Sequence, residues 1–453
     1  MGRDGVGLEA SPGPPPPGPD GRRRQAVAWC LLLLLLAVVS RLVYLHHFGV
    51  ESQEGGDMGE YIALARHLAS GDGFTFDGLS PATYRPPLFS CLLAGWCWLL
   101  GDTRLGAMVA FQVVVQSLAA PLAYLLVRAA QRSHRWAIGC GFLMSVYPYL
   151  ISTVSLVLQE PTLTLIATLT GIAFVSWCRT PSLSRAVATG ACLGLSALGK
   201  SPFLAGPIVV LLVGWVFRRH PRCPPWRQVV LAAAVSAAVI VPWTLRNALV
   251  AGRFVPINSQ GAGAVIWMVA DGHFRARETP SDPIPQQLDP EQGVGFTYGN
   301  EDGVAYLLKH NEDLLRQGVS GSGIERGLEA AARSYLVRHP LYVLRLLARG
   351  MILMAAPYAV GPLREHPRVR LAAMVLIHLP LAIGFAVGLL RSWREHDAAI
   401  AMLSLIATLY LLAHSTVVAE GGRYAAPLLP AAMAIAGYGF FGGQVRGVGR
   451  AGR

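Results

Sequence analysis

The sequence predicts an all-α polytopic membrane protein with about ten transmembrane helices, interfacial helices and a small outer cap loop. Its 453 residues are 53% hydrophobic and only 14% charged, whereas soluble domains are about 25% charged. Several apolar runs approach or exceed the ~20 residues that cross a bilayer core. Arginine-rich turns alternate with turns that are poor in basic residues, which places the arginine-rich turns in the cytoplasm.

The chain is expected to begin with a disordered cytoplasmic tail, residues 1–24, which is rich in Pro and Gly and ends in three arginines. The first apolar run, about 26–48, is too long for a signal-peptide core and is interpreted as an anchor. A polar loop, 51–87, then lies outside. The short run 88–101 follows a double proline, which favours an interfacial or re-entrant helix.

Residues 25–249 are predicted to form an N-terminal transmembrane catalytic module that carries the outer loop 51–87. Further spans are expected at about 105–128, 136–152, 161–178, 186–200, 202–217 and 229–249.

In the remainder of the chain, outer and cytoplasmic segments are expected to alternate in the same way. Residues 250–340 form an outer, periplasmic or lumenal, loop. Residues 341–443 hold an interfacial helix and the C-terminal transmembrane helices, and residues 444–453 form a cytoplasmic tail. Within these regions we expect two short helices, at 303–316 and 323–338, one interfacial helix, at 339–357, and three spans, at 371–390, 398–417 and 425–443.

Composition also excludes some functions. The net charge of +12 is explained by arginines that flank the spans, and no basic soluble face suggests nucleic-acid binding. The seven cysteines show no metal spacing and are interpreted as small hydrophobes. HExxH and GxSxG motifs are absent from the sequence.

Two carboxylates stand out. Asp57 lies in the first outer loop, four residues before Tyr61, which opens a helical pattern. Glu160 is the single carboxylate between Asp102 and Asp271, at the outer end of a span, where a charge is costly and marks function by default. The alternatives are a solvated loop acid for Asp57 and a helix-start acid for Glu160, which Pro161 follows.

Four cations are predicted at the same outer surface: Arg85, Lys200, Arg246 and Arg423. Lysine occurs only at positions 200 and 309, so Lys200 at an outer turn is unusual. Together these cations suit a lipid phosphate, held next to an acid that acts on a hydroxyl. Each alone could instead contact lipid headgroups or snorkel to the interface.

The order of these motifs resembles the GT-C class of integral-membrane glycosyltransferases, in the branch with protein O-mannosyltransferases and the lipid A aminoarabinose transferase. The segments that carry the resemblance are Asp57-x-x-x-Tyr61, Tyr84-Arg85-Pro86-Pro87, Glu160-Pro161, Leu198-Gly199-Lys200, Val241 to Asn247 and Arg423-Tyr424. Asp57 is followed by Met58, whereas many relatives have Asp-Glu there.

The resemblance implies a sugar transfer from a polyprenyl-phosphate donor to a lipid, glycan or protein hydroxyl. Asp57 and Glu160 would be the catalytic carboxylates, with Tyr61, Tyr84, Arg85, Lys200, Arg246, Arg423 and Tyr424 binding substrate. No cofactor is required with certainty, although a divalent metal at Asp57 and Glu160 is possible. The donor, the acceptor and membrane lipid are the expected partners.

Two other functions fit a polytopic chain: a transporter or flippase of a lipid-linked sugar, and a membrane scaffold. The outlying charges gather at one surface and no repeat relates the two halves, which favours the enzyme over a transporter. The outer loops contain no N-x-S/T sequon, which favours a bacterial inner membrane with a periplasmic site. An endoplasmic reticulum protein is the alternative.

Overall fold

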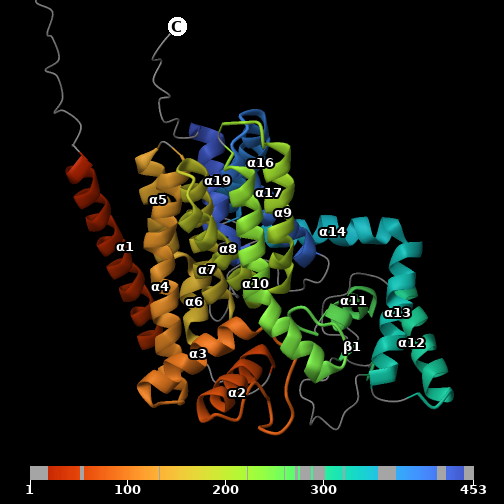
Figure 1. Ribbon diagram of the computed structural model, residues 1–453. Coiled ribbons are helices and arrows are strands. Elements are labelled where there is room, and N and C mark those ends of the chain that lie inside the picture. The colour runs from red at the N-terminus through yellow and green to blue at the C-terminus, as the bar shows by residue number, and fades with distance from the viewer. Residues whose placement is uncertain are drawn as a thin grey trace, which may run out of the picture.

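The structure is a computed structural model (Figure 1) that describes residues 19–50, 56–131, 133–221, 223–259, 261–270, 274–275, 287–288, 301–319, 322–355, 374–415 and 425–442. Its N-terminal part contains α1 (Pro19–Phe48), α2 (Gly56–Ser70), α3 (Pro87–Leu100), α4 (Leu105–Ala130), α5 (His134–Val146), α6 (Pro148–Ser152), the 3₁₀ helix η1 (Thr153–Ser155), α7 (Glu160–Arg179), α8 (Leu183–Gly199), the 3₁₀ helix η2 (Ser201–Ala205), α9 (Gly206–Val216) and α10 (Trp226–Ala251).

The C-terminal part contains α11 (Gly261–Ala270), β1 (Phe274–Arg275), β2 (Gln287–Leu288), α12 (Glu301–Arg316), α13 (Ser322–Arg338), α14 (Pro340–Ala355), the π-helical turn η4 (Met374–His378), α16 (Leu379–Arg394), α17 (Ala398–Ser415), the 3₁₀ helix η5 (Ala426–Leu428) and α19 (Leu429–Phe441). The two short strands pair antiparallel, with Phe274 opposite Leu288. Helices α12 and α13 fall where the sequence predicts the two short outer helices.

Seven helices among the described residues are long and apolar enough to cross a membrane. Their bounds are Asp20–Phe48, Leu105–Ala130, His134–Ser155, Glu160–Arg179, Trp226–Ala251, Val375–Arg394 and Ala398–Ser415. Shorter apolar helices cover Leu183–Gly199, Ser201–Val216 and Ala426–Phe441, where the sequence predicts further spans, and Pro87–Leu100, where it predicts an interfacial helix. The expectation of an all-α polytopic membrane protein is confirmed.

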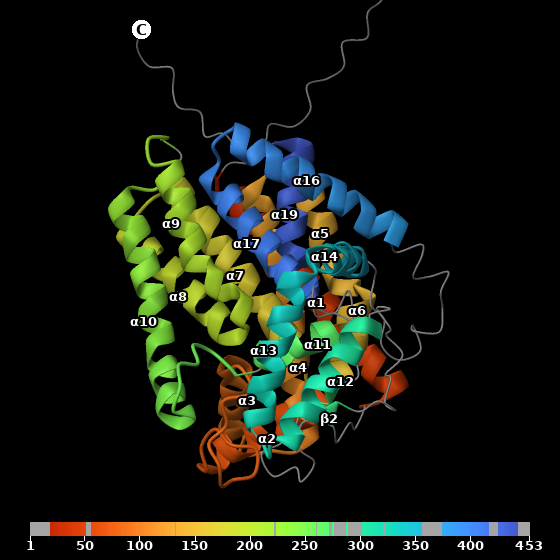
Figure 2. The same ribbon diagram turned by 90° about the vertical axis from the view of Figure 1, so that its right-hand side faces the viewer.

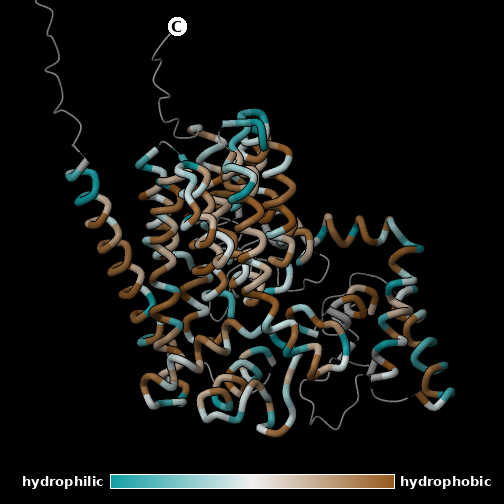
Figure 3. The backbone as a smooth tube through the Cα atoms, viewed as in Figure 1, coloured by the Kyte–Doolittle hydropathy of each residue, from teal (hydrophilic) through white to brown (hydrophobic). Residues whose placement is uncertain are grey.

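The bundle is held by one large apolar core. Buried side chains of α1, α4, α5, α7 to α10, α17 and α19 contribute to it, and most bundle helices are hydrophobic along their length (Figure 3). Arg41 of α1 is a charged side chain that is fully buried in this region. It donates to the carbonyl of Ser145 at 2.8 Å and to that of Met144 at 3.3 Å. These carbonyls end α5, so Arg41 supplies donors that the helix terminus lacks.

Helices α2 and α3 lie at the end of the bundle opposite the start of α1, and α11 to α13 lie beside the same end (Figures 1 and 2). Helices α11 to α13 have a small apolar core of their own, which includes Ile266, Leu307, Leu328 and Tyr335. Helices α2 and α3, which flank the first predicted outer loop, therefore share one end of the molecule with α11 to α13.

Helix α14 runs across the bundle axis, and it is seen end-on after the 90° turn (Figure 2). It meets the C-terminal end of α17 backbone to backbone, because a Cβ at Gly350 would lie 1.8 Å from the carbonyl oxygen of Ser415. Only glycine fits this contact. The helix therefore lies at the depth where α17 ends, and its position in the membrane interface stays a prediction.

Candidate active site

Helix α2 carries two acidic side chains that meet one arginine. Asp57 lies in its first turn, where a carboxylate is favoured by the helix N-terminus. Glu60 follows one turn later, and side chains three residues apart lie on the same helix face. Tyr61 and Leu64 lie four residues after Asp57 and Glu60, on the same side of the helix, and both are fully buried.

Arg85 is the partner of both acids. Its Nη2 donates to Asp57 Oδ1 at 2.5 Å, and its Nε donates to Glu60 Oε2. The rings of Tyr61 and Tyr84 lie 5.2 and 5.3 Å from the guanidinium carbon, within cation–π range. Pro86 and Pro87 start α3 directly after Arg85 and fix the backbone that carries it.

The charges around Arg85 favour its ionised form. Burial disfavours a charged guanidinium, but Tyr61, Asp57 and Glu60 raise the pKa of Arg85 well above its usual value. The Arg85 side chain is 6% exposed and that of Glu60 is 7% exposed, whereas Asp57 is 27% exposed. Asp57 is therefore the acid of this cluster that a substrate can reach.

A second ion pair joins Glu160 and Lys200. Glu160 begins α7 with Pro161 in its first turn, and Lys200 follows the last residue of α8. Lys200 Nζ lies 3.7 Å from Glu160 Oε1. The Glu160 side chain is fully buried and that of Lys200 is 10% exposed, so each charge compensates the burial of the other.

Apolar packing links the two ion pairs. A Cβ at Gly199 would lie 2.6 Å from Leu163 Cδ2 and 3.2 Å from Leu88 Cδ2, so α3, α7 and α8 meet at this glycine. Leu88 lies three residues after Arg85, Leu163 three residues after Glu160, and Lys200 follows Gly199 directly. The acid–base residues predicted from four distant segments therefore gather in one region at one end of the bundle.

The start of α7 is held from α4 and from α2. Gln112 of α4 donates from Nε2 to the carbonyl of Leu158 at 2.8 Å. Met58 and Tyr61 of α2 share one apolar cluster with residues 156–158. These contacts fix the chain two residues before Glu160 on both sides, so they orient the carboxylate.

Aromatic side chains of α17 line the neighbourhood of Lys200. The Phe203 ring lies 4.7 Å from that of Tyr410, and Tyr410 stacks on His414 at 4.3 Å. His414 is buried and its Nδ1 bonds the carbonyl of Tyr410 at 2.9 Å. This wall of the site comes from a span far along the chain.

Arg246 contacts the first outer loop. Its Nη2 donates to the carbonyl of Phe74 at 3.2 Å and its Nη1 donates to that of Ala82. The guanidinium carbon lies 5.5 Å from the Phe74 ring and 4.8 Å from that of Trp243. The structure thus places Arg246 as an anchor of the loop, and its role as a phosphate ligand stays a prediction.

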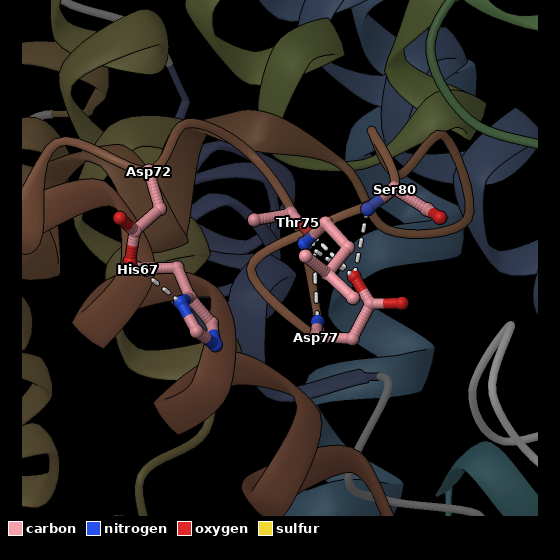
Figure 4. A network of polar contacts seen from close by, with 6 residues as sticks. His67, Asp72, Thr75, Asp77 and Ser80 are labelled. Atoms are coloured by element: carbon pink, nitrogen blue, oxygen red, sulfur yellow. Dashed lines mark hydrogen bonds and ion pairs between the residues drawn. The ribbon is translucent and has the colours of Figure 1, made fainter.

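The loop between α2 and α3 is closed by its own polar side chains (Figure 4). Asp77 Oδ1 accepts from the amides of Leu79 at 2.9 Å and Ser80 at 2.8 Å, and from the Thr75 hydroxyl at 2.9 Å. These hydrogen bonds lower the pKa of Asp77 to about 2. His67 Nδ1 and Asp72 Oδ2 lie 2.9 Å apart. This turn chemistry gives the loop a defined shape beside Arg85.

Two predicted substrate-binding residues, Arg423 and Tyr424, lie outside the described residues. For a metal, the described part of the chain holds no group of three or more His, Cys, Asp or Glu side chains placed to bind one. The two candidate ligands Asp57 and Glu160 each face a cation instead, Arg85 and Lys200. A divalent ion at these two acids therefore stays a prediction.

Sequence reasoning missed Glu60, Gln112 and His414. Glu60 has the pattern of an ordinary acid on an exposed helix face, and the only signal for it was its spacing of one turn from Asp57. Gln112 and His414 lie in apolar runs, where polar side chains do mark buried contacts. Their partners are distant in sequence, so the pattern alone could not assign them.

The comparisons with known proteins agree with this fold. Residues 85–255 match the family model of dolichyl-phosphate-mannose-protein mannosyltransferases. This segment contains Arg85, Glu160, Lys200 and Arg246, but it begins after α2. No curated protein sequence matches the chain.

Solved structures align over most of the chain. The Archaeoglobus fulgidus oligosaccharyltransferase AglB, in complex with an inhibitory peptide and a dolichol-phosphate, aligns with a TM-score of 0.53 and 13% identity, over 92% of this chain and 50% of that one. The same archaeal enzyme in complex with Zn and sulfate aligns with a TM-score of 0.51 and 13% identity, over 91% and 48%.

A structure of the S. cerevisiae protein O-mannosyltransferase Pmt1–Pmt2 complex bound to the sugar donor aligns with a TM-score of 0.39 and 16% identity, over 58% of this chain and 38% of that one. This chain spans about half the length of the archaeal enzymes. The resemblance predicted from the sequence is confirmed: this multi-pass membrane protein has the fold of the GT-C glycosyltransferases, and its residues 85–255 match their mannosyltransferase family.

Proposed function

We propose that this protein transfers a sugar from a polyprenyl-phosphate donor to a hydroxyl acceptor at the outer or lumenal membrane face. The observation that carries the proposal is the meeting of two acid–cation pairs, Asp57–Arg85 and Glu160–Lys200, at one end of an apolar bundle. The match to a family that uses a dolichyl-phosphate sugar supports this donor class.

In the proposed reaction Asp57 is the base. The acceptor oxygen attacks the anomeric carbon while Asp57 takes the hydroxyl proton, and the bond from that carbon to the phosphate oxygen breaks. The electron pair of this bond leaves with the polyprenyl phosphate. A single displacement of this kind inverts the anomeric configuration.

The leaving phosphate gains negative charge, and Arg85 and Lys200 are proposed to stabilise it. Charges act more strongly in a buried site than in water. Both cations already have protein carboxylates as partners, so their positive charges are compensated before the donor binds. Arg423 and Tyr424 are proposed to complete the site, and Arg246 is proposed to contribute by holding the outer loop in place.

The activity is tested with purified protein and a polyprenyl-phosphate sugar in detergent or nanodiscs. Free polyprenyl phosphate should appear together with a glycosylated acceptor. Asp57→Asn should lower the rate roughly 10²–10⁴-fold, the usual range for loss of a general base, with the donor KM little changed. Glu160→Gln is the companion variant, because a normal Asp57→Asn rate with loss in Glu160→Gln would move the base to Glu160.

Normal rates in both variants would leave the mechanism without a base and refute it. The same preparation distinguishes the alternative functions. Movement of the intact lipid-linked sugar across proteoliposomes, without release of polyprenyl phosphate, would support a transporter. A bacterial inner membrane is the proposed location, with the endoplasmic reticulum as the alternative.

A further inference from the structure

The guanidinium of Arg85 donates to two acids through two different nitrogen atoms. Its Nε edge donates to Glu60 and its Nη2 donates to Asp57. The Tyr61 and Tyr84 rings lie within cation–π distance of the guanidinium carbon. None of the described residues accepts from Nη1. Within the described part of the chain, Nη1 is therefore the nitrogen of Arg85 with no protein acceptor.

The two acids differ in burial. The Glu60 side chain is 7% exposed and the Asp57 side chain is 27% exposed. A buried carboxylate is stable only beside a cation, so Glu60 and Arg85 form the fixed part of the cluster. Asp57 is the accessible part. One guanidinium thus faces two carboxylates, and the cluster has a net negative charge before any phosphate binds.

We propose that Glu60 is a positioning residue that compensates the charge of Arg85, so that Asp57 keeps its basicity and Nη1 stays directed toward the donor phosphate. This inference rests on the proposed function. Without Glu60, the full positive charge of Arg85 would act on Asp57. A carboxylate held by an uncompensated guanidinium binds a proton less readily, which weakens it as a base.

Other groups of the described residues also lie near Asp57. The titratable groups that meet at Arg85 are Asp57, Glu60 and the Tyr61 hydroxyl, with the Tyr84 ring on the guanidinium. The elements packed against α2 here, namely α3, α4 and residues 156–158, contribute apolar side chains to the cluster. Because Glu60 and Asp57 both accept from Arg85, a change of charge at position 60 is expected to reach Asp57 through this guanidinium.

The test compares Glu60→Gln, which keeps the shape and an acceptor for Nε, with Glu60→Asp, which keeps the charge. Asp72→Asn is the matched control, since Asp72 is an exposed acid that pairs with His67 in the following loop. We expect Glu60→Gln to lower kcat roughly tenfold or more with a smaller change in donor KM. Glu60→Asp should recover part of the rate, and Asp72→Asn should match the wild type.

The effect of the Glu60 charge on the protonation of Asp57 can also be measured without catalytic turnover. Carbodiimide modifies protonated carboxyls, and mass spectrometry reports the modification of Asp57 as a function of pH. In Glu60→Gln its midpoint should move about one pH unit lower, because an opposite charge nearby lowers a carboxyl pKa by roughly 1–3 units. The acid limb of the pH–rate profile should move in the same direction.

The outcomes separate the two claims. Wild-type protein that releases no polyprenyl phosphate refutes the proposed function, and the carbodiimide midpoint still decides the role of Glu60. An unchanged midpoint and pH profile in Glu60→Gln would overturn the inference. So would a lower melting temperature in both Glu60 variants with unchanged kcat in the folded fraction, because Glu60 would then only hold α2 in place.

Discussion

The Glu160–Lys200 pair gives a quantitative test of the site, through the variants Glu160→Gln, Lys200→Met and the double variant. The two charges are 3.7 Å apart, and their side chains are 0% and 10% exposed. With an effective dielectric constant of about 20, unit charges at this distance attract by roughly 4–5 kcal/mol. Removing one member of a buried pair costs about 3–5 kcal/mol, because the other charge is left uncompensated.

Each single variant should therefore lower the thermal midpoint of the purified protein by several degrees. The double variant should recover most of the loss, since neutral side chains of similar size often replace a buried pair without destabilisation. Lys309→Met is the matched control. Lys309 is the only other lysine and lies exposed on α12, so this variant should melt with the wild type.

Activity should not follow stability in this series. The double variant should regain its midpoint but remain slow, because it has lost a cation for the donor phosphate. Lys200→Met alone should weaken use of the donor by about 10- to 100-fold, as expected for a charge-assisted contact of about 1.5–3 kcal/mol. Single variants that melt with the wild type, or a double variant whose loss is the sum of the single losses, would refute the coupling.

Three further predictions concern the loop and the topology. Arg246→Met should expose residues 71–82 to limited proteolysis, because it removes the donors to Phe74 and Ala82; the exposed Arg253→Met should not. The pKa of Asp77 is lowered in the folded loop, so the ionised carboxylate stabilises the loop at pH values above the ordinary Asp pKa of 3.8, and this contribution should be lost as pH falls toward about 2. Amide protection of residues 79–80 between pH 5 and pH 2 measures this loss. Protection that does not change over this range would contradict the prediction. Single cysteines at position 309 in α12 should react with an impermeant reagent in intact cells and those at position 219 should not; the reverse pattern would contradict the proposed sidedness.

The sequence located most helices because their signals are local. Expected helices at 303–316 and 323–338 appear as α12 (Glu301–Arg316) and α13 (Ser322–Arg338), and that at 339–357 appears as α14. Hydrophobic runs and prolines set these bounds within a few residues. The crossing of α14 over the end of α17 was not predictable in detail, because it depends on a contact between Gly350 and Ser415.

Most residues of the candidate site could be predicted from the sequence, but the contacts between them could not. Asp57 and Arg85 were both expected, but Glu60 between them was not, since an acid on an amphipathic helix is ordinary. Arg246 was expected near a phosphate, whereas the structure places it on backbone carbonyls of the loop. Carbonyl partners have no sequence signal, because every residue has one.

Glu160 and Lys200 show that a charged residue in an apolar sequence is informative, because burying its charge costs free energy. Each was singled out separately, as a charge that a span should not contain, and 40 positions separate them in the chain. Either charge alone in this buried position would destabilise the protein by several kcal/mol. The structure brings them within 3.7 Å, so each accounts for the presence of the other. A pair of apolar residues would fill the same space at no greater cost in stability. The retention of two charges there, beside the Asp57–Arg85 cluster, is therefore best explained by what they bind.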